Sequence, residues 1–302
     1  MVHVDGFQTV HSDALACRIC ATPSPKVGVK RGKWRLQDYV LYRCPHCSFA
    51  FVGNPSTDYD QIYTLDYYKG QGADPLTDYF GELERPKQTI RRYEWHGITE
   101  IISQLQPLSL DTKWLDFGCG NGGLVRWVKS YQGCDIVGFE EGAIADIARS
   151  QGIPILTADA LAAQANCYDV ITAIEVLEHV DDPIGVLKQL FGLLKPGGVF
   201  FYTTGNATRY RDCLTEWGYV VPEIHISFYE PATLEYALTN VGFRAQPIRY
   251  SKGFTEVIRF KVLKNLGLKQ TCWWERLLPW FMLSPLVDRR FGVSAFPVGY
   301  KD

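Results

Sequence analysis

The sequence predicts an α/β fold, a doubly wound and mostly parallel sheet of seven strands, with a small metal-binding module before it. Three observations predict this fold: paired cysteines near the amino terminus, a glycine-rich turn at 118–123, and strands that alternate with helices after that turn. Such alternation places parallel strands in one sheet with helices on both faces. The 302 residues are 46% apolar, which suffices for a large core, and the net charge of −2 argues against a dedicated nucleic-acid binder.

Four cysteines form two C-x-x-C pairs in the first part of the chain. Cys17 and Cys20 form the first pair, and Cys44 and Cys47 form the second. Each pair can bind a metal ion from a tight turn, and two such turns supply the four sulfur ligands of a structural zinc site. The apolar and aromatic residues between the pairs suffice for a small ribbon of strands, whose small core the metal would stabilise. We therefore predict a zinc-ribbon module at 1–55.

Two features of this region have two interpretations each. The ribbon is locally basic, and this surface either contacts RNA or is an ordinary solvated face, which we favour. Residues 56–112 form a tyrosine-rich linker whose last part, 86–105, has the apolar spacing of a helix. The tyrosines either belong to a flexible lid with stacking side chains or pack between helices.

An apolar strand, a glycine turn and a helix amino terminus follow one another in the middle of the chain. Gly118, Gly120 and Gly122 let the backbone approach a ligand closely, and the helix exposes backbone N–H groups to it. With Gly123, the same turn also fits the G-x-G-x-x-G of nicotinamide and flavin enzymes. Asp116 distinguishes these interpretations, because its carboxylate would repel a pyrophosphate and attract a ligand with a cationic end.

Six further strands and three helices follow the glycine turn. We predict strands at 135–140, 154–159, 168–174, 199–203, 243–250 and 294–300, and helices at 143–148, 183–194 and 230–241. The strand at 168–174 is almost wholly apolar, as expected of a strand that is buried on both faces. Pro183 and Pro231, each after an acidic residue, occupy the first turns of the last two helices.

The order of these motifs resembles that of the class I S-adenosylmethionine-dependent methyltransferases. The resemblance covers 86–302 and rests on Glu140 and on the strings at 115–122, 159–160, 175–180 and 194–198. It implies a Rossmann-like methyltransferase core at 113–302, with a helical insertion at about 255–292. It also implies that Asp116, Gly118, Gly120 and Gly122 bind S-adenosylmethionine.

The resemblance assigns roles to further residues at the carboxyl edge of the sheet. It implies that Glu140 binds the ribose hydroxyls, which its place at the end of the second strand suggests independently. It implies that Asp159 binds the adenine amino group, that Ala160 contacts the ring edge, and that Glu175 belongs to the same cofactor site.

The ribbon, the tyrosine-bearing linker and this core together resemble small-molecule methyltransferases of sugar and glycan biosynthesis. The strings at 175–180 and 225–234 also resemble those of ubiquinone-pathway O-methyltransferases. The resemblance implies O- or C-methylation of a small-molecule acceptor, such as a sugar, a glycan precursor or another secondary metabolite. The main alternative is an RNA methyltransferase that docks its substrate through the ribbon. A degenerate member without activity and a nicotinamide oxidoreductase are further alternatives.

Two histidines are candidates for a catalytic base. His225 lies with Glu223 after the fifth strand, where the acceptor should sit, and Glu223 could orient it or act as a second base. His179 follows the fourth strand at the same edge of the sheet, and it is either a base or a structural hydrogen-bonding residue.

The sequence also bears on the location of the protein. The amino-terminal residues lack the basic and apolar stretches of a signal peptide, and the longest apolar stretch, 277–287, is about half a membrane span. We therefore expect a cytoplasmic protein without a transmembrane segment. The apolar segment 261–291 caps the acceptor pocket, forms a dimer contact, contacts a membrane surface, or is simply a packed helical insertion. The sequence does not indicate an oligomeric state.

Overall fold

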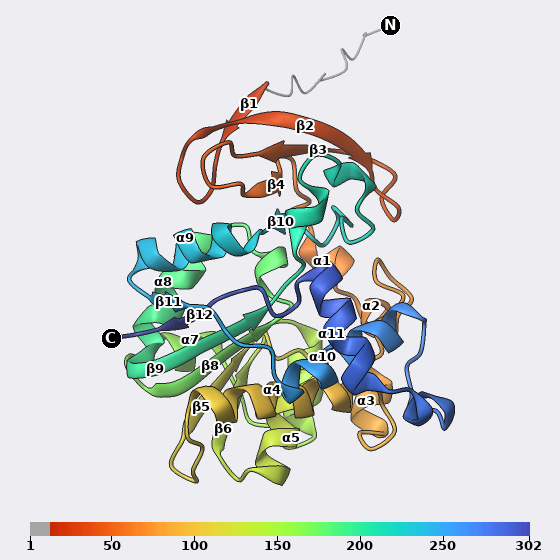
Figure 1. Cartoon of the computed structure of the whole chain (residues 1–302), viewed down its shortest axis with the longest axis vertical. Helices are drawn as coiled ribbons and strands as arrows, with labels where there is room; N and C mark the ends of the chain where they lie inside the picture. Colours follow the sequence, from red (N-terminus) through yellow and green to blue (C-terminus); the bar gives the residue numbers. More distant parts are fainter. Residues whose placement is uncertain (1–12) are drawn as a thin grey trace, which may run out of the picture.

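Two β-sheets organise the molecule, and the computed structural model describes residues 13–302 (Figure 1). The first twelve residues of the predicted ribbon module, and with them the amino terminus considered for a signal peptide, lie outside the described residues. The smaller sheet has the strand order β1-β2-β3-β4-β10, with all neighbours antiparallel. Its strands are β1 (Ala14–Ala16), β2 (Pro23–Arg31), β3 (Asp38–Arg43), β4 (Ala50–Val52) and β10 (Ser227–Phe228).

The larger sheet has seven strands in the order β11-β12-β9-β8-β5-β6-β7. β12 runs antiparallel to both of its neighbours, and the other neighbouring pairs are parallel. This order confirms the predicted doubly wound, mostly parallel sheet. Its strands are β5 (Lys113–Phe117), β6 (Asp135–Phe139), β7 (Ile155–Leu156), β8 (Tyr168–Ile174), β9 (Leu194–Thr203), β11 (Arg244–Gln246) and β12 (Val298–Tyr300).

Helices cover both faces of the larger sheet. One face carries α4 (Arg91–Leu105), α5 (Gly123–Tyr131), α6 (Ala143–Ser150) and α10 (Lys252–Asn265), which share one apolar cluster with the strands. The other face carries α7 (Ala158–Ala162), α8 (Pro183–Leu193) and α9 (Pro231–Val241). Ribbon side chains such as Tyr42 and Phe51 belong to this second cluster, so the ribbon packs directly on the core.

The ribbon and the core also share a strand. β10 follows the larger sheet's β9 in the sequence, yet it pairs with β4 of the ribbon. Thr233, in the first turn of α9, donates its hydroxyl to the Cys47 carbonyl at 2.7 Å, and Arg43 forms an ion pair with the buried Glu230. The ribbon therefore forms one wall of the core.

The structure shortens three of the predicted strands and lengthens a fourth. The strand predicted at 294–300 is reduced to β12. The strand predicted at 154–159 is reduced to β7, because the Thr157 side chain accepts the N–H of Ala160 and begins α7. The strand predicted at 243–250 is reduced to β11. In contrast, β9 already begins at Leu194, and its pairing with β8 shifts between residues 194 and 199. The residues between the predicted helix at 183–194 and the predicted strand at 199–203 therefore form an irregularity inside the strand.

Two helical additions lie beside the glycine turn. The first contains α1 (Tyr59–Ile62), α2 (Leu65–Tyr68) and α3 (Tyr79–Glu84), and we call residues 56–85 the lid. Tyr67 and Tyr68 of the lid are buried in an apolar cluster, so the packing alternative describes these two tyrosines. The second addition contains α10 and α11 (Trp280–Phe291) between β11 and β12, where the insertion is predicted. Within residues 13–302, no helix combines the length and the apolar character needed to cross a bilayer.

Candidate functional site

The glycine turn connects β5 to α5 at the carboxyl edge of the larger sheet. Gly118, Gly120 and Gly122 have φ angles of +71°, +54° and +69°, a left-handed conformation in which a side chain would be strained. The N–H of Gly118 donates to the Phe139 carbonyl at 2.8 Å, which holds the turn against the end of β6. The backbone conformation of the turn therefore favours glycine at all three positions.

Two carboxylates lie beside this turn. Asp116, in β5, is 4% exposed, and its Oδ1 accepts the Thr172 hydroxyl at 2.8 Å. Glu140, directly after β6, accepts the N–H of Gly120 at 2.9 Å. Burial raises the pKa of Asp116 and of Glu140 to about 7. A cation that binds next to such a carboxylate stabilises its ionised form, so this corner of the site favours a cationic ligand.

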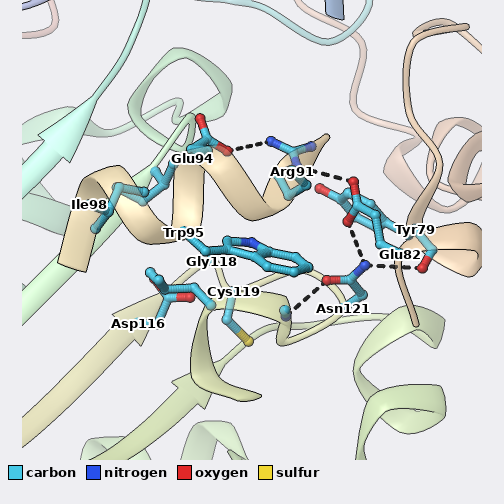
Figure 2. A pocket seen from close by; sticks show the side chains of 13 residues that line it. Tyr79, Glu82, Arg91, Glu94, Trp95, Ile98, Asp116, Gly118, Cys119 and Asn121 are labelled. Atoms are coloured by element: carbon cyan, nitrogen blue, oxygen red, sulfur yellow. Dashed lines mark hydrogen bonds and ion pairs between the residues drawn. The ribbon is translucent and has the colours of Figure 1, made fainter. Parts of the chain in front are cut away.

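A pocket lies between the glycine turn and α4 (Figure 2). Three carboxylates line it, those of Asp116, Glu82 and Glu94, against the single guanidinium of Arg91. Arg91 pairs with Glu82 at 3.1 Å and with Glu94 at 2.7 Å. The Oε1 of Glu94 is buried and has no hydrogen-bond partner among the described residues. An unpaired buried oxygen is costly, so the pocket suits a ligand that brings an ammonium group to it.

Asn121 connects the glycine turn to the lid. Its Nδ2 donates to Glu82 at 2.7 Å and to the Tyr79 carbonyl at 3.0 Å, both in α3. Its Oδ1 accepts the N–H of Gly123 at 3.0 Å, at the start of α5. One buried side chain therefore fixes the distance between the lid, the turn and the following helix.

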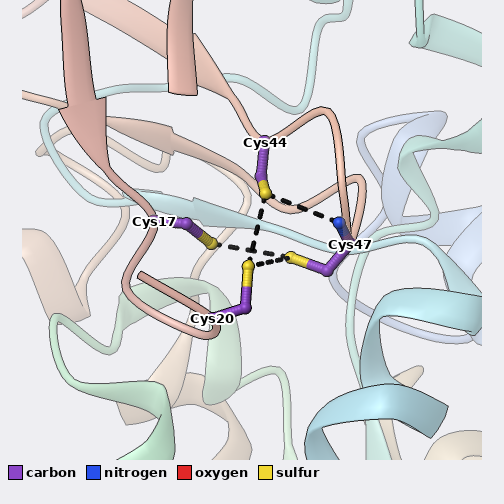
Figure 3. A group of neighbouring side chains, drawn as sticks. All are labelled: Cys17, Cys20, Cys44 and Cys47. Atoms are coloured by element: carbon purple, nitrogen blue, oxygen red, sulfur yellow. Dashed lines mark hydrogen bonds between the residues drawn. The ribbon is translucent and has the colours of Figure 1, made fainter. Parts of the chain in front are cut away.

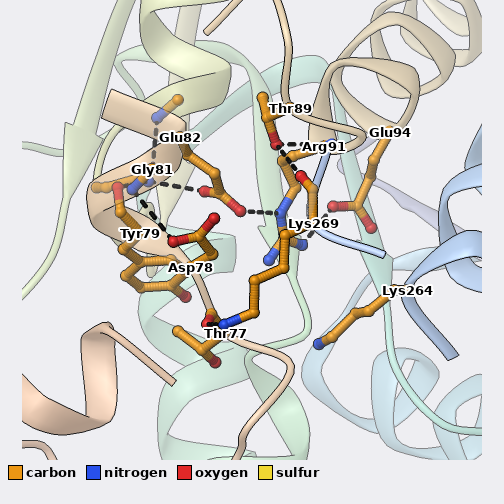
Figure 4. A network of polar contacts seen from close by, with 12 residues as sticks. Thr77, Asp78, Tyr79, Gly81, Glu82, Thr89, Arg91, Glu94, Lys264 and Lys269 are labelled. Carbon is orange, nitrogen blue, oxygen red and sulfur yellow. Dashed lines mark hydrogen bonds and ion pairs between the residues drawn. The ribbon is translucent and has the colours of Figure 1, made fainter. Parts of the chain in front are cut away.

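Lysines from the insertion hold the lid from the other side (Figure 4). The Nζ of Lys269 donates to the Thr77 carbonyl at 3.1 Å, and Lys264 pairs with Asp74 at 3.4 Å. The lid is therefore fastened both to the glycine turn and to the helices that precede β12.

A second polar group follows β8, at the same edge of the sheet. Glu175 has a left-handed φ of +54°, and its Oε1 lies 2.7 Å from the Nζ of Lys261. The Tyr219 hydroxyl lies 2.5 Å from Glu178 and 3.2 Å from Glu175. Burial raises the pKa of Glu175, but the charge of Lys261 outweighs burial and lowers it to about 2. Burial and the charge of Glu175 raise the pKa of Glu178 to about 8.

The structure brings His179 and His225 together, with ring centroids 4.9 Å apart. The Nδ1 of His179 lies 2.8 Å from the Ile224 carbonyl, and that of His225 lies 2.6 Å from the Tyr219 carbonyl. Because a carbonyl only accepts, each Nδ1 carries the proton and each Nε2 is left to accept one. Burial lowers the pKa of both rings, that of His179 to about 3, so both are neutral at pH 7.

Glu223 does not share this arrangement. Its Oε1 accepts the N–H of Trp34, in the ribbon, at 2.8 Å, and the residue is fully buried. The His225 ring is instead held by the Tyr219 carbonyl. The prediction that Glu223 orients His225 rests on their closeness in the sequence. The chain folds into a turn at Val221, so Glu223 accepts the N–H of Trp34 while His225 contacts the Tyr219 carbonyl.

Asp159 and Ala160 lie at the same edge, in the first turn of α7. Asp159 is exposed, and the N–H of Ala160 donates to the Thr157 hydroxyl at 3.3 Å. β7 is the parallel neighbour of β6, so these residues follow a strand end adjacent to that of Glu140. The sheet thus aligns the residues that the sequence assigns to the nucleoside.

The four paired cysteines form one cluster in the ribbon (Figure 3). All four Sγ atoms lie within 4.8 Å of one another, and three Sγ–Sγ distances are 3.5, 3.4 and 3.6 Å. Sulfurs that bind one tetrahedral ion at about 2.3 Å would lie roughly 3.8 Å apart. The spacing therefore fits four thiolates around a single ion.

Both cysteine turns have the same backbone shape. The residue after each pair, Ala21 or Ser48, has a left-handed φ of 59° or 61°. In the first turn, the N–H of Ile19, two residues on, faces the Cys17 sulfur at 3.4 Å. In the second turn, the N–H of Cys47, three residues on, faces the Cys44 sulfur at 3.4 Å. Such N–H groups stabilise thiolates, which are the form that binds a metal.

Glu178, His179 and His225 form a second group that offers ligand atoms within 4.8 Å of one another. Both oxygens of Glu178 are already engaged, one by Tyr219 and the other by the Thr204 hydroxyl at 2.9 Å. Glu178 is therefore held by hydrogen bonds to both of its oxygens.

Sequence reasoning missed several residues of the site: Glu82, Arg91, Glu94, Asn121, Tyr219 and Lys261. Arg91 and Glu94 stand three residues apart in a predicted helix, a spacing that pairs charges on one face, so they carried a usable signal. Lys261 carried none, because it lies 86 residues from its partner Glu175.

Comparison with known proteins finds relatives over the same region. A family model described as a methyltransferase domain matches residues 74–247, more than half of the chain. The ubiquinone biosynthesis O-methyltransferase of Vibrio parahaemolyticus is 30% identical over 160 residues, which cover 46% of this chain and 66% of that protein. Its counterpart in Psychrobacter arcticus is 33% identical over 159 residues, which cover 45% of this chain and 60% of that protein.

The chain thus spans two thirds or less of the length of these curated relatives. Among solved structures, a SAM-dependent methyltransferase from Archaeoglobus fulgidus superimposes with a TM-score of 0.46 at 15% identity, over 74% of this chain and 98% of that chain.

Proposed function

Because the chain belongs to the methyltransferase-domain family, we propose that it transfers the methyl group of S-adenosylmethionine to a hydroxyl group of a small molecule. The names of its curated relatives support O-methylation of a small acceptor. A sugar, a glycan precursor or another secondary metabolite is the acceptor class that the ribbon and linker favour. When bound, the cofactor supplies an electrophilic methyl group on a sulfonium cation.

One observation carries the choice of cofactor: the acidic pocket beside the glycine turn. Asp116, Glu82 and Glu94 line it against one arginine, and one Glu94 oxygen is unpaired. A dinucleotide would bring a pyrophosphate to this turn, where the carboxylates repel it. The zwitterionic methionine end of S-adenosylmethionine instead brings an ammonium group and a nearby sulfonium.

The residues present fit the two ends of this cofactor. We assign the ammonium group to Glu94 and Asp116, which both line the pocket. We assign the ribose to Glu140 and the adenine to Asp159 and Ala160, which follow the neighbouring strand ends. Glu140 already accepts an N–H from the glycine turn, so its carboxylate is oriented before any ligand binds.

The histidines provide the base that removes the proton of the acceptor hydroxyl. With Nδ1 fixed on the Tyr219 carbonyl, His225 accepts a proton at Nε2, and His179 is held in the same tautomer beside it. The lowered pKa values keep both rings unprotonated at pH 7, the form that can accept a proton. A positioned base of this kind contributes roughly 10²–10⁴-fold to the rate.

We further propose that the cysteine cluster holds one structural zinc ion. Four sulfurs at tetrahedral spacing, without an oxygen or nitrogen ligand, form a closed site that stabilises the ribbon and leaves no open position for chemistry. The ion therefore acts on stability and not on the methyl group.

The ribbon cations support a small acceptor over RNA. Five of the seven basic residues of the ribbon make contacts within the chain, so they are not a ready surface for phosphates. These contacts are Arg18–Asp181, Arg31–Asp38, Arg35–Asp58, Arg43–Glu230 and Lys30 to the Thr215 carbonyl.

Calorimetry with the metal-loaded protein tests the cofactor. We expect S-adenosylmethionine and S-adenosylhomocysteine to bind with measurable heat and NADH to give none. Radiolabelled S-adenosylmethionine with a panel of hydroxylated sugars, nucleotide sugars and phenols then identifies the acceptor class. Tight binding of NADH without binding of S-adenosylmethionine would overturn the proposal.

The variant His225→Ala tests the base once an acceptor is known. We expect kcat to fall by about 100-fold or more, because the proton loses its acceptor, while the Kd of S-adenosylmethionine stays within about twofold. The matched control is His96→Ala, which removes a partly exposed imidazole of α4 outside the cysteine turns. Equal turnover in His225→Ala and the parent would remove His225 from the mechanism.

A further inference from the structure

One segment carries half of the large apolar side chains that are exposed. Sixteen such side chains occur among residues 13–302, and eight of them lie at 266–291. They are Leu266, Trp273, Trp274, Leu277, Phe281, Met282, Leu286 and Phe291. With Arg276, Arg289 and Arg290, which are also exposed, we call them the insertion face.

Helix α11, which is dark blue in Figure 1, carries the second part of this face. Phe281, Met282, Leu286 and Arg289 are exposed at the spacing of one helix side, while Trp280 is buried on the other. Trp273 and Phe281 are 76% and 74% exposed, although aromatic side chains of this size are normally mostly buried. An apolar stripe turned outward on a surface helix marks an interaction site.

The charge of the insertion face has one sign. Every charged residue that is exposed at 265–291 is an arginine. The two acids of this segment are engaged elsewhere, since Glu275 is fully buried and paired with Arg259, and Asp288 accepts the N–H and the hydroxyl of Ser294 at 2.8 and 2.6 Å. The whole chain is slightly acidic, so this face departs from the average.

We propose that the insertion face binds the surface of an anionic phospholipid membrane. Such a surface binds aromatic and aliphatic side chains that are flanked by arginines. The apolar groups enter the headgroup region, and the arginines pair with lipid phosphates. A second copy of the chain fits less well. A twofold contact through this face would bring arginines together without exposed acids to pair with them.

The proposal places the membrane next to the lid. The insertion that carries the face also contains Lys261, which pairs with Glu175, and Lys264, which pairs with Asp74 in the lid. One side of the insertion would therefore contact lipid while the other contacts the site. The binding does not depend on methyl transfer, so it is tested without any acceptor.

Vesicle co-sedimentation of the full chain tests it. We expect binding to vesicles of phosphatidylcholine with about 30% phosphatidylglycerol, and at least about tenfold weaker binding to phosphatidylcholine alone. Tryptophan emission should shift to shorter wavelength on binding, because Trp273 leaves water.

Three variants locate the contact. Arg289→Glu with Arg290→Glu, and separately Phe281→Ser with Leu286→Ser, should each lower the partition constant by about tenfold or more while leaving thermal unfolding unchanged. The matched control is Leu110→Ser, which removes another exposed leucine far from α11 in the sequence and should bind as the parent does.

Two results would overturn the proposal. One is vesicle binding that is absent, or equal with and without phosphatidylglycerol. The other is a stable dimer in light scattering that Phe281→Ser with Leu286→Ser dissociates, which would make a second copy of the chain the partner.

Discussion

Among single residues, Asp116 is the one on which the proposed choice of ligand depends. It is almost completely buried, and burial raises its pKa to about 7. A cationic ligand binds the ionised form, so binding below pH 7 must first expel a proton. The affinity should therefore rise with pH up to about 7 and level off above it, with a slope of at most about tenfold per pH unit.

We predict that Asp116→Asn lowers the affinity for S-adenosylmethionine by about tenfold or more at pH 8 and weakens its pH dependence between pH 6 and 8. Calorimetry at several pH values measures both effects. Asp135→Asn is the matched control, since it removes an exposed carboxylate at the opposite end of the neighbouring strand β6. Unchanged affinity in Asp116→Asn would show that the turn does not recognise a cation.

Other residues of the site were predictable because they belong to short sequence motifs. The cysteine pairs and the glycine turn are recognisable because their ligands or backbone conformations lie within a few residues of one another. The unpaired Glu94 oxygen and the Lys261–Glu175 pair depend on tertiary packing. Glu223 illustrates the same limit, because only one residue separates it from His225 in the sequence, yet the fold gives it a partner in the ribbon.

At the scale of elements, the lid and the glycine turn are joined by one side chain. We predict that Asn121→Ala loosens α3 and costs about 1–3 kcal/mol of unfolding free energy, because Glu82 and the start of α5 lose buried hydrogen bonds. Hydrogen exchange of residues 79–84 should accelerate, and Ser130→Ala in α5 should leave it unchanged. Identical exchange in Asn121→Ala would mean that the insertion lysines alone hold the lid.

The insertion and the sheet edge are joined by a partly buried ion pair. About a quarter of each side chain of Lys261 and Glu175 is exposed, so we predict that Lys261→Met costs about 2–3 kcal/mol at pH 7, less than breaking a fully buried pair. The pKa of Glu175 is depressed to about 2 in the parent, so the pair stabilises the protein above about pH 4.5 and loses this effect as the pH falls toward 2.

Urea unfolding at pH 7 and pH 4 measures this prediction. The deficit of Lys261→Met should shrink at pH 4, because Glu175 then takes up a proton in the variant. The control is Lys261→Met with Glu175→Gln, which removes both charges and should be more stable than the single variant at pH 7. A deficit that is equal at both pH values would contradict the assignment of the effect to charge.

For the molecule as a whole, the order of strands and helices was predictable and their extents were less so. Apolar runs and proline-capped helices set the alternation, and the seven-stranded sheet follows it. The end of β7 depends on the competition between strand pairing and the Thr157 cap, which a pattern of apolar residues does not report. The ribbon's use of β10 was not predictable, because Ser227 and Phe228 lie about 175 residues from their partners.

We predict that loss of the metal destabilises the core together with the ribbon. Cys44→Ser should lose one zinc per chain by elemental analysis and should lower the midpoint of a single thermal transition by more than about 10 °C. Cys272→Ser is the control, because this cysteine lies outside the cluster and should retain the metal. Two separate transitions, with the core transition unchanged, would show that the two parts unfold independently.

The shared strand has a practical consequence for anyone who trims this protein. A fragment that starts after β4 would keep the proposed site residues, but it would leave β10 (Ser227 and Phe228) without its partner strand and would expose aromatic side chains that the ribbon covers. We expect such a fragment to precipitate during expression, so the shortest stable version must retain the cysteine turns.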